Sequence, residues 1–254
     1  LTPEGTAFLE KATLILSEME SLHFHPQASD TTPETLSVSM TKFSHVMESF
    51  ISVVQKHSEQ PEFTPRLYEG QVNEVVDDVL QGRVDIGVLH FHRARREAFA
   101  ADLAAKGLSY HFLAYAEPRI VISKDHPLVR AHKPMTRENL APYGFVRYLG
   151  LYDDVLAQLW GGAFSQDRLG GKKEIFVTGR ATLMNLISQT DFYSVGIHDF
   201  DKQLSDFGAV SLPIPGCQAS VEFGYITLQG VPITQIGQEF LHEVQAALTH
   251  EQTG

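Results

Sequence analysis

Cysteine is almost absent from this sequence of 254 residues, since Cys217 is the only one. One thiol cannot form an internal disulfide, which favours a reducing compartment, and it cannot build a zinc cluster from cysteines. Long hydrophobic runs are absent too, and none approaches the about 18 residues that span a bilayer. Residues 1–5 lack the basic start and apolar stretch of a signal peptide. These absences favour a cytoplasmic protein.

Basic residues are also scarce. Lys and Arg number 20 against 31 Asp and Glu, which gives a formal net charge of -11. A surface that neutralises DNA phosphates needs clustered Lys and Arg. The balance of this chain is the opposite, so we expect it to bind nucleic acid poorly on its own.

Catalytic and nucleotide-binding motifs are missing as well. There is no Gly-x-Ser-x-Gly elbow, Walker loop or dinucleotide fingerprint, because the glycine pairs at 161–162 and 170–171 do not follow strands. Cys217 lies in a Pro/Gly turn without a neighbouring base. The acidic pairs at 77–78 and 153–154 lie on predicted helices and are typical of solvated faces. We therefore expect neither catalytic residues nor a cofactor.

A helix is predicted over residues 1–24, with Thr2 as its cap and Pro3 in its first turn. Its apolar residues follow heptad spacing, and they are Phe8, Ala12, Ile15, Met19 and Leu22. Two heptads fit either a dimerising linker helix or an amphipathic helix that lies on its own domain. The polar, turn-rich residues 25–34 are typical of a linker.

Strands and helices alternate after residue 35. The pattern predicts strands at 36–40, 63–68 and 84–89, and helices at 43–54 and 72–80. This order is typical of a parallel sheet covered by helices. The second half repeats the theme. Its predicted strands are 119–123, 143–148, 174–178, 192–197, 209–213 and 220–228, its helices are 152–160 and 180–189, and its last helix carries the apolar stripe Ile236, Phe240, Leu241, Val244 and Leu248.

Two proline-marked junctions, at 117–118 and 212–216, divide this α/β chain. We interpret them as two crossings between lobes, so that 35–116 and 216–254 form lobe I and 117–215 form lobe II. In open α/β folds the strand ends face a shared cleft, where ligands bind.

Two strand-to-helix turns would lie at this cleft. Their candidate effector-binding residues are Ser39, Met40, Thr41 and Lys42 in lobe I and Thr178, Gly179 and Arg180 in lobe II. Free N–H groups at a helix start can hold a carboxylate or phosphate, and Lys42 and Arg180 add charged donors. The alternative is that Thr41 and Thr178 are only N-caps.

His90 and His92 end a buried strand, so both rings point to one face. With His198 they could hold a metal, but no acidic residue stands at a zinc spacing. A pair of histidines is more often structural or part of a pocket wall. We therefore predict no metal site and place His90, His198 and Tyr148 in the wall of the effector pocket.

The helix at 43–54 has an apolar arc wider than the about 100° that one core requires. The excess favours a second contact surface, in which this helix packs on the 180–189 helix of a second subunit. The predicted interface residues are Phe43, Val46, Phe50, Val53, Val54, Leu183 and Leu186.

Taken in order, these segments resemble the LysR-type transcriptional regulators. The opening LTPEGTAFLEKATLILSEMESL is similar to their linker helix, and the stretch from LSVSM to GRVDIGVL follows their order of strand, helix, strand ending in Glu-Gly, helix and strand. The segment YAEPRIVISKDHPL resembles their lobe-crossing strand, and IFVTGRATLMNLISQTDFYSVGI resembles the strand–helix–strand of their second lobe.

This resemblance implies a two-lobed fold like that of type 2 periplasmic binding proteins, with a small effector between the lobes. It also implies side-by-side homodimers or homotetramers, and a winged helix-turn-helix ahead of the first helix, which alone would bind DNA. We interpret the chain as the effector-sensing and dimerisation domain of such a regulator, with a small anion, a carboxylate, as effector.

The alternative is an extracytoplasmic solute-binding protein of a transporter. It shares the fold, but the heptads and the missing secretion signal argue against it. A third class is an enzyme built on the same fold.

The charge balance leads to a first prediction. This chain should show no sequence-specific DNA binding at physiological salt, because its net charge of -11 opposes phosphate contacts. A mobility-shift assay with candidate operator DNA measures this directly. Tight, sequence-dependent retardation by the chain itself would contradict the prediction.

Overall fold

The structure is a computed structural model of the chain, and it describes Thr2, Gly5 and residues 35–42, 44–149, 173–197 and 207–250. Some sequence predictions lie outside these residues. They are the heptad of the 1–24 helix, the 152–160 helix, Phe43 and His198. No helix of the described residues is long and apolar enough to cross a membrane.

The first sheet has the strand order β2-β1-β3-β10-β4. Its strands are β1 (Ser37–Thr41), β2 (Arg66–Gly70), β3 (Ile86–His92), β4 (Leu108–Ala116) and β10 (Val221–Leu228). The pairs β1–β2 and β1–β3 are parallel, as the sequence predicts, but β10 runs antiparallel to both β3 and β4. The sheet is therefore mixed, because the chain returns from its far end to insert β10.

Helices cover both faces of this sheet. On one face, α2 (Ser44–Lys56) packs against α10 (Gln235–His250), with the rings of Phe50 and Phe240 6.3 Å apart. On the other face, α3 (Val72–Leu80) and α4 (Arg96–Ala105) share a core cluster with Leu89 of β3.

The bounds of α3 confirm the predicted helix at 72–80, and local signals explain both ends. Its N-terminus carries a capping box, in which the Gln71 backbone N–H donates to Glu74 Oε2 at 2.6 Å. Gly82 follows its end with a φ of 65°, a conformation that glycine adopts without strain.

No sequence pattern predicted α4, the short 3-10 helix η1 (Arg93–Arg95) before it, or β4 after it. Only Leu103 of the ten residues in α4 is buried, so the helix lacks the apolar stripe that reveals a helix in a sequence. Leu103 packs in the core cluster beside the sheet and holds the helix there. A single buried residue does not produce the helical period of apolar residues by which a sequence predicts a helix.

The second sheet has the order β7-β6-β8-β5-β9. Its strands are β5 (Pro118–Ser123), β6 (Phe145–Tyr148), β7 (Glu174–Val177), β8 (Tyr193–Ile197) and β9 (Ala209–Pro213). The helix α8 (Arg180–Gln189) covers one face through Leu183, Met184 and Ile187. The short helices α5 (Pro127–Arg130) and α6 (Arg137–Leu140) contribute Leu128 and Leu140 to the opposite face.

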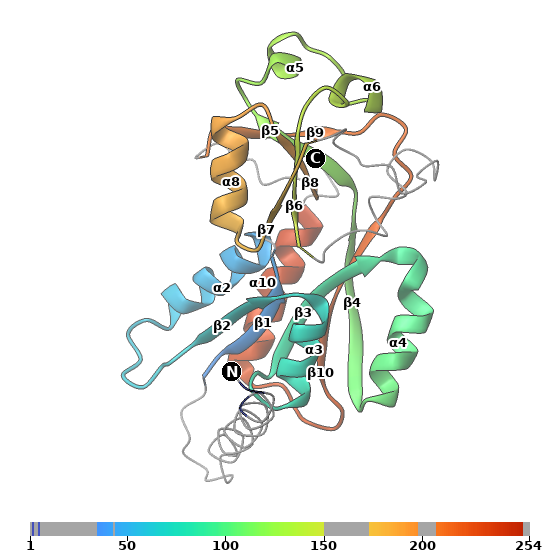
Figure 1. The fold of residues 1–254 in the computed structure, drawn as a ribbon. Helices are drawn as coiled ribbons and strands as arrows, with labels where there is room; N and C mark the ends of the chain where they lie inside the picture. Colours follow the sequence, from blue (N-terminus) through green and yellow to red (C-terminus); the bar gives the residue numbers. More distant parts are fainter. Residues whose placement is uncertain are drawn as a thin grey trace.

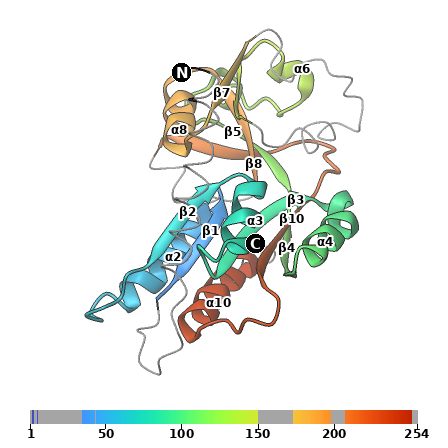
Figure 2. The ribbon, with the colours of Figure 1, turned by 60° about the horizontal axis from the view of Figure 1, so that its bottom comes forward.

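The two sheets form two lobes that the chain crosses twice. The first crossing leads from β4 through Glu117 into β5, and the second leads from β9 through residues 214–220 into β10 (Figure 1). We call the part around the first sheet lobe I and the part around the second sheet lobe II. The turned view also shows lobe II stacked on lobe I along these segments (Figure 2). One core cluster includes Leu113 before and Ile120 after the first crossing, so apolar packing continues between the lobes.

The wide apolar arc of α2 has an explanation within the chain. Val46, Phe50 and Val53 have exposed fractions of only 1%, 8% and 0%, and they belong to the core of lobe I. Leu183, with an exposed fraction of 6%, belongs to the core of lobe II. These four residues are not available to a partner, because α2 fits between its own sheet and α10. The interface prediction then depends on the outer residues of the two helices, such as Val54 and Leu186.

A buried histidine in lobe II predicts a pH-dependent stability. His126 Nδ1 accepts from the Leu128 N–H at the start of α5, and Nε2 lies 3.2 Å from the Asp191 carbonyl oxygen, to which it donates. Burial lowers the pKa of His126 below its ordinary value of 6.5, since the neutral ring satisfies both contacts. The contribution of His126 is therefore complete above the unfolded value and is lost as the pH falls below it.

The melting temperature should fall more steeply for the wild type than for His126→Asn between about pH 7.5 and about pH 5. Asparagine keeps a capping acceptor and does not titrate. The exposed His132, whose φ of 49° suits asparagine, offers the control His132→Asn, which should keep the wild-type slope. Thermal unfolding at several pH values measures all three, and equal slopes for wild type and His126→Asn would refute the assignment.

Candidate functional site

The structure brings together the two turns that the sequence analysis selected. β1 ends at Thr41, and Lys42 follows it. Lys42 Nζ donates a hydrogen bond to the backbone carbonyl of Thr178, which lies between β7 and α8 in lobe II. The same Nζ lies 5.2 Å from the ring centroid of Tyr148. One cation of lobe I therefore contacts two elements of lobe II.

Arg180 is the first residue of α8 and stands next to this contact. Burial lowers the pKa of its guanidinium, while the charges of Tyr148, Glu69 and Glu48 oppose that shift. An arginine stays protonated at physiological pH even so. Burial also raises the pKa of Tyr148 to about 12, so its hydroxyl is neutral and can donate. We call Thr41, Lys42, Tyr148, Thr178 and Arg180 the interlobe junction.

Thr41 and His90 form the inner wall of lobe I at this junction. Thr41 Oγ1 lies 2.5 Å from His90 Nδ1, and both residues have exposed fractions of 2%. The His90 ring also packs 5.7 Å from the ring of Phe223 on β10. This contact joins the ends of β1 and β3, so it fixes the backbone from which Lys42 extends.

The N-cap interpretation of the two threonines is wrong. α2 begins at Ser44, three residues after Thr41, whose hydroxyl contacts His90 instead. The N-cap of α8 is Gly179, which has no side chain to form a cap, and Thr178 precedes it. The N–H groups at the start of α8 therefore lack a side-chain cap from this position.

Ser39 and Met40 lie below the surface. Both have exposed fractions of 0%, and the Ser39 hydroxyl donates to Asp78 Oδ2 of α3 at 2.6 Å. Asp78 also forms an ion pair of 2.9 Å with Arg83. The Ser39 side chain thus holds β1 against α3, and a ligand at the junction could meet only the backbone of these two residues.

Gln71, which was not predicted as a site residue, also contacts the opposite lobe. Its side-chain Nε2 donates to the Leu149 carbonyl at 3.3 Å, which makes a second contact between the lobes. Gln71 follows β2, which is parallel to β1, so both strands end at the same edge of the sheet. The rule that ligands bind at the carboxyl ends of parallel strands could have identified this turn as well.

His90 and His92 make different contacts. His90 binds Thr41, whereas His92 Nδ1 accepts from the Ala94 N–H at 3.2 Å. Among the residues that the structure describes, no group of three or more His, Cys, Asp or Glu could hold a metal ion. The described part of the junction is thus a set of cationic and hydroxyl donors, with Glu48 and Glu69 near Arg180 as the acidic groups.

Comparison with known protein families matches residues 53–249 to the family described as the LysR substrate binding domain. No curated protein matches the sequence.

Solved structures of the same kind share the fold. The effector-binding domain of QuiR in complex with shikimate is 13% identical, with a TM-score of 0.58, and the match covers 87% of this chain and 98% of that one. The BenM effector-binding domain with its effector benzoate is 14% identical, with a TM-score of 0.57 and coverages of 88% and 96%. Full-length OxyR C199D from Pseudomonas aeruginosa is 14% identical, with a TM-score of 0.61 and coverages of 100% and 80%.

Proposed function

Since the chain belongs to the LysR substrate-binding domain family, we propose that it senses a small carboxylate at the interlobe junction on behalf of a transcription regulator. The observation that carries this proposal is the contact of Lys42 with the Thr178 carbonyl, next to Arg180 and Tyr148. A primary ammonium group and a guanidinium placed on opposite lobes are the donors that a bridging anion requires.

The start of α8 adds to this attraction. Its first N–H groups follow Gly179, which provides no side-chain acceptor, and a helix N-terminus carries a partial positive charge. A carboxylate there could accept from these N–H groups and from Lys42 at the same time. Two of the related domains are complexes with shikimate and with benzoate, which are small carboxylates, and this supports the same ligand class here.

The proposed switch is a competition at Lys42. Without an anion, Lys42 donates to the Thr178 carbonyl. With one, the ammonium group and Arg180 would both bind the carboxylate, and the lobes would be held at the separation that the ligand sets. A ligand shifts the population of lobe arrangements only as far as its affinities for them differ. The regulator would transmit that shift to its DNA-binding part.

The family match supports a regulator over a solute-binding protein of a transporter, which the sequence left as an alternative. The family match likewise favours a regulator over an enzyme on this fold.

A carboxylate at the junction should stabilise the fold measurably. At about 100 times its dissociation constant a ligand adds about 2.7 kcal/mol, and each kcal/mol raises the melting temperature of a chain this size by about 2–4 °C. A thermal-shift screen of organic acids should yield a hit of several degrees, and the neutral amide of the same compound should yield none.

Variants test whether the ligand binds at the interlobe junction. Lys42→Met should weaken binding about tenfold to a hundredfold, because a hydrogen bond to a charged group contributes about 1.5–3 kcal/mol. Lys106→Met, at the far end of α4, is the matched control and should bind like the wild type. Thr178→Ala should also bind normally, since its carbonyl and not its hydroxyl contacts Lys42. Shifts by neutral or cationic compounds, or an unaffected Lys42→Met, would contradict the proposal.

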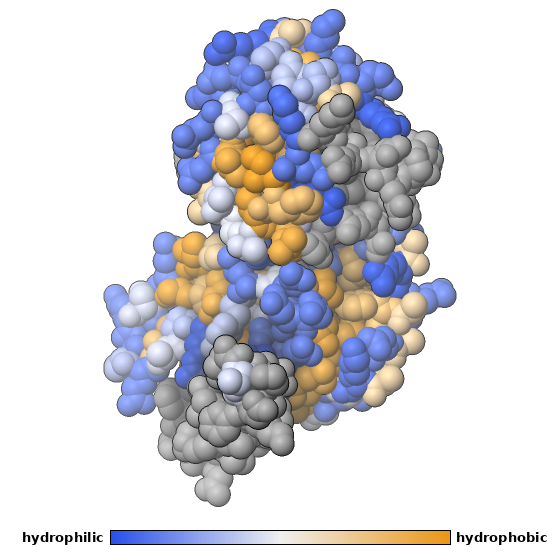
Figure 3. Space-filling view, viewed as in Figure 1, coloured by the Kyte–Doolittle hydropathy of each residue, from blue (hydrophilic) through white to orange (hydrophobic). Residues whose placement is uncertain are grey.

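We further propose that the chain forms an isologous dimer through the outer faces of α2, β2 and β7. Large apolar side chains are exposed there: Ile51 at 44%, Tyr68 at 44% and Phe176 at 53%. The space-filling view shows apolar surface over α2 in lobe I and beside α8 in lobe II on one side of the molecule (Figure 3). Exposed apolar surface of this kind is typical of protein interfaces.

Ile51→Asp should convert the dimer to a monomer, because the partner would bury an unpaired carboxylate. Val231→Asp, at a side chain that is 56% exposed in the turn after β10, is the control and should remain dimeric. Val53→Asp is unsuitable, since Val53 lies in the core and its loss would unfold lobe I. Sedimentation equilibrium at micromolar concentration measures the three masses. A monomeric wild type, or a dimeric Ile51→Asp, would refute this interface.

A further inference from the structure

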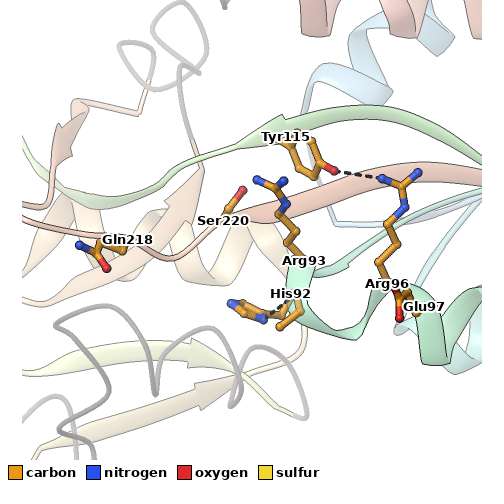
Figure 4. A pocket seen from close by; sticks show the side chains of 8 residues that line it. His92, Arg93, Arg96, Glu97, Tyr115, Gln218 and Ser220 are labelled. Carbon is orange, nitrogen blue, oxygen red and sulfur yellow. Dashed lines mark hydrogen bonds between the residues drawn. The ribbon is translucent and has the colours of Figure 1, made fainter.

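A cavity of about 610 Å³ lies on lobe I next to both lobe crossings. We call it the hinge cavity, and its lining is drawn in Figure 4. The residues are His92, Arg93, Ala94, Arg96, Glu97, Tyr115, Gln218 and Ser220. They come from the end of β3, from η1 and the first residues of α4, from the end of β4 and from the connection that leads into β10. None of them belongs to the interlobe junction.

Arg93 supplies a guanidinium group to the hinge cavity. Its guanidinium lies 4.4 Å from the ring centroid of Tyr115, and no carboxylate of the described residues forms an ion pair with it. Its backbone N–H donates to the Ser220 carbonyl at 3.1 Å, so the residue is anchored to the second crossing. Stacking fixes the plane of the guanidinium and leaves its N–H groups available to an acceptor.

Arg96 differs from Arg93 because its charge is already balanced. Its Nε lies 3.4 Å from Glu222 Oε1, a carboxylate with an exposed fraction of 0%, and it donates to the Tyr115 hydroxyl at 3.0 Å. Arg96 therefore holds the wall of the hinge cavity, and Tyr115 joins the two arginines (Figure 4). Glu97 is the one acidic residue of the lining, so basic groups predominate in this part of an acidic chain.

His92 supplies a second donor to the hinge cavity. Its exposed fraction is 7%, and its Nδ1 accepts from the Ala94 N–H, which places the proton of the neutral ring on Nε2. Among the described residues, Nε2–H has no hydrogen-bond partner. Figure 4 shows one ring nitrogen turned to the turn after β3 and the other turned away from it, on the side of Gln218. His92 lines the hinge cavity, so this N–H is available to a bound acceptor.

We propose that the hinge cavity binds a phosphate group, either free phosphate or that of a small metabolite. Its lining offers four donors from four side chains: the guanidinium of Arg93, Nε2–H of His92, the hydroxyl of Ser220 and the amide of Gln218. Several donors suit the several oxygens of a phosphate better than the two oxygens of a carboxylate. The site is thus distinct in place and in ligand chemistry from the carboxylate site at the junction.

Occupancy would link the two crossings. Tyr115 immediately precedes the end of β4 and the first crossing, whereas Gln218 and Ser220 belong to the second. A phosphate group that contacts both segments favours the lobe arrangement in which they are adjacent. By linkage, it would then alter the affinity of the junction for its own ligand.

The test is a ³¹P NMR titration of the chain with inorganic phosphate at millimolar concentrations. The wild type should broaden and shift the phosphate resonance in a saturable manner. Arg93→Gln should weaken binding about tenfold or more, since it removes a charged donor. Arg95→Gln is the matched control, because it changes the same charge two residues away on a side chain outside the lining, and it should bind within about twofold of the wild type. Equal weakening by both variants would mean a response to net charge alone and would overturn the site.

Two more variants distinguish phosphate binding in the hinge cavity from anion binding at the junction. His92→Phe keeps a flat ring and removes both nitrogens, so it should weaken phosphate binding several-fold, and its melting temperature reports whether the fold survives. Lys42→Met should leave phosphate binding unchanged, because Lys42 belongs to the junction. Loss of phosphate binding in Lys42→Met would place the anion at the junction and overturn the proposal, as would a wild type that does not bind phosphate. The carboxylate screen and Lys42→Met in that screen test the proposed function separately.

Discussion

Strand β10 completes the sheet of lobe I only after the chain has passed through lobe II and returned. The strand arrives after the whole of lobe II, yet it lies between β3 and β4, antiparallel to both. Lobe I is incomplete until this return, and both crossings are fixed by it. The fit is close, because a Cβ on Gly224 would meet the Tyr110 ring at 2.2 Å. The Tyr110 hydroxyl in turn donates to the buried Glu222 at 2.7 Å. This hydrogen bond and the lack of a side chain at Gly224 favour the same register between β4 and β10.

The placement of functional groups follows from this return of the chain. Because β10 occupies the position beside β3, the parallel strands β1, β2 and β3 form one side of the sheet, and β1 and β2 end next to lobe II. Lys42 and Gln71 extend from those ends to the Thr178 and Leu149 carbonyls. The donors at the junction are therefore supplied by turns, while the strands that position them are buried and rigid. Turns held by a rigid scaffold at strand ends are common positions for binding residues.

The sequence predicted those parts of the fold that depend on local signals. The helices at 72–80 and 180–189 were predicted with their observed bounds, since their apolar residues recur with the helical period. The α4 helix was missed because Leu103 is its one buried residue. The interface assignment of Val46, Phe50 and Val53 was wrong for a related reason. These residues pack on the core that α10 completes. The pattern of residues 43–54 cannot show that a helix near the end of the sequence covers them.

The candidate site was predictable in its position but not in its contacts. Topology indicated that Lys42 and Arg180 approach each other from opposite lobes, since both follow strand ends. It could not indicate that Lys42 would bind the backbone of Thr178, or that the Thr41 hydroxyl would bind His90. Both contacts join residues far apart in the sequence, and side-chain geometry decides them. The hinge cavity was not predicted at all, because much of its lining comes from η1, the start of α4 and the end of β4, and none of these segments carried a pattern in the sequence.

The strand β3 connects the two sites physically. His90 and His92 are separated by one residue, so their side chains leave the same face of the strand. His90 fixes Thr41 next to Lys42, and His92 lines the hinge cavity. Since β3 is buried along its whole length between β1 and β10, its end can shift only together with its neighbours. An anion bound to His92 at the proposed phosphate site would thus act on the strand that holds the junction wall. The chain therefore has a short, packed route by which a ligand at the crossings and a ligand between the lobes could influence each other, without a rearrangement of either core.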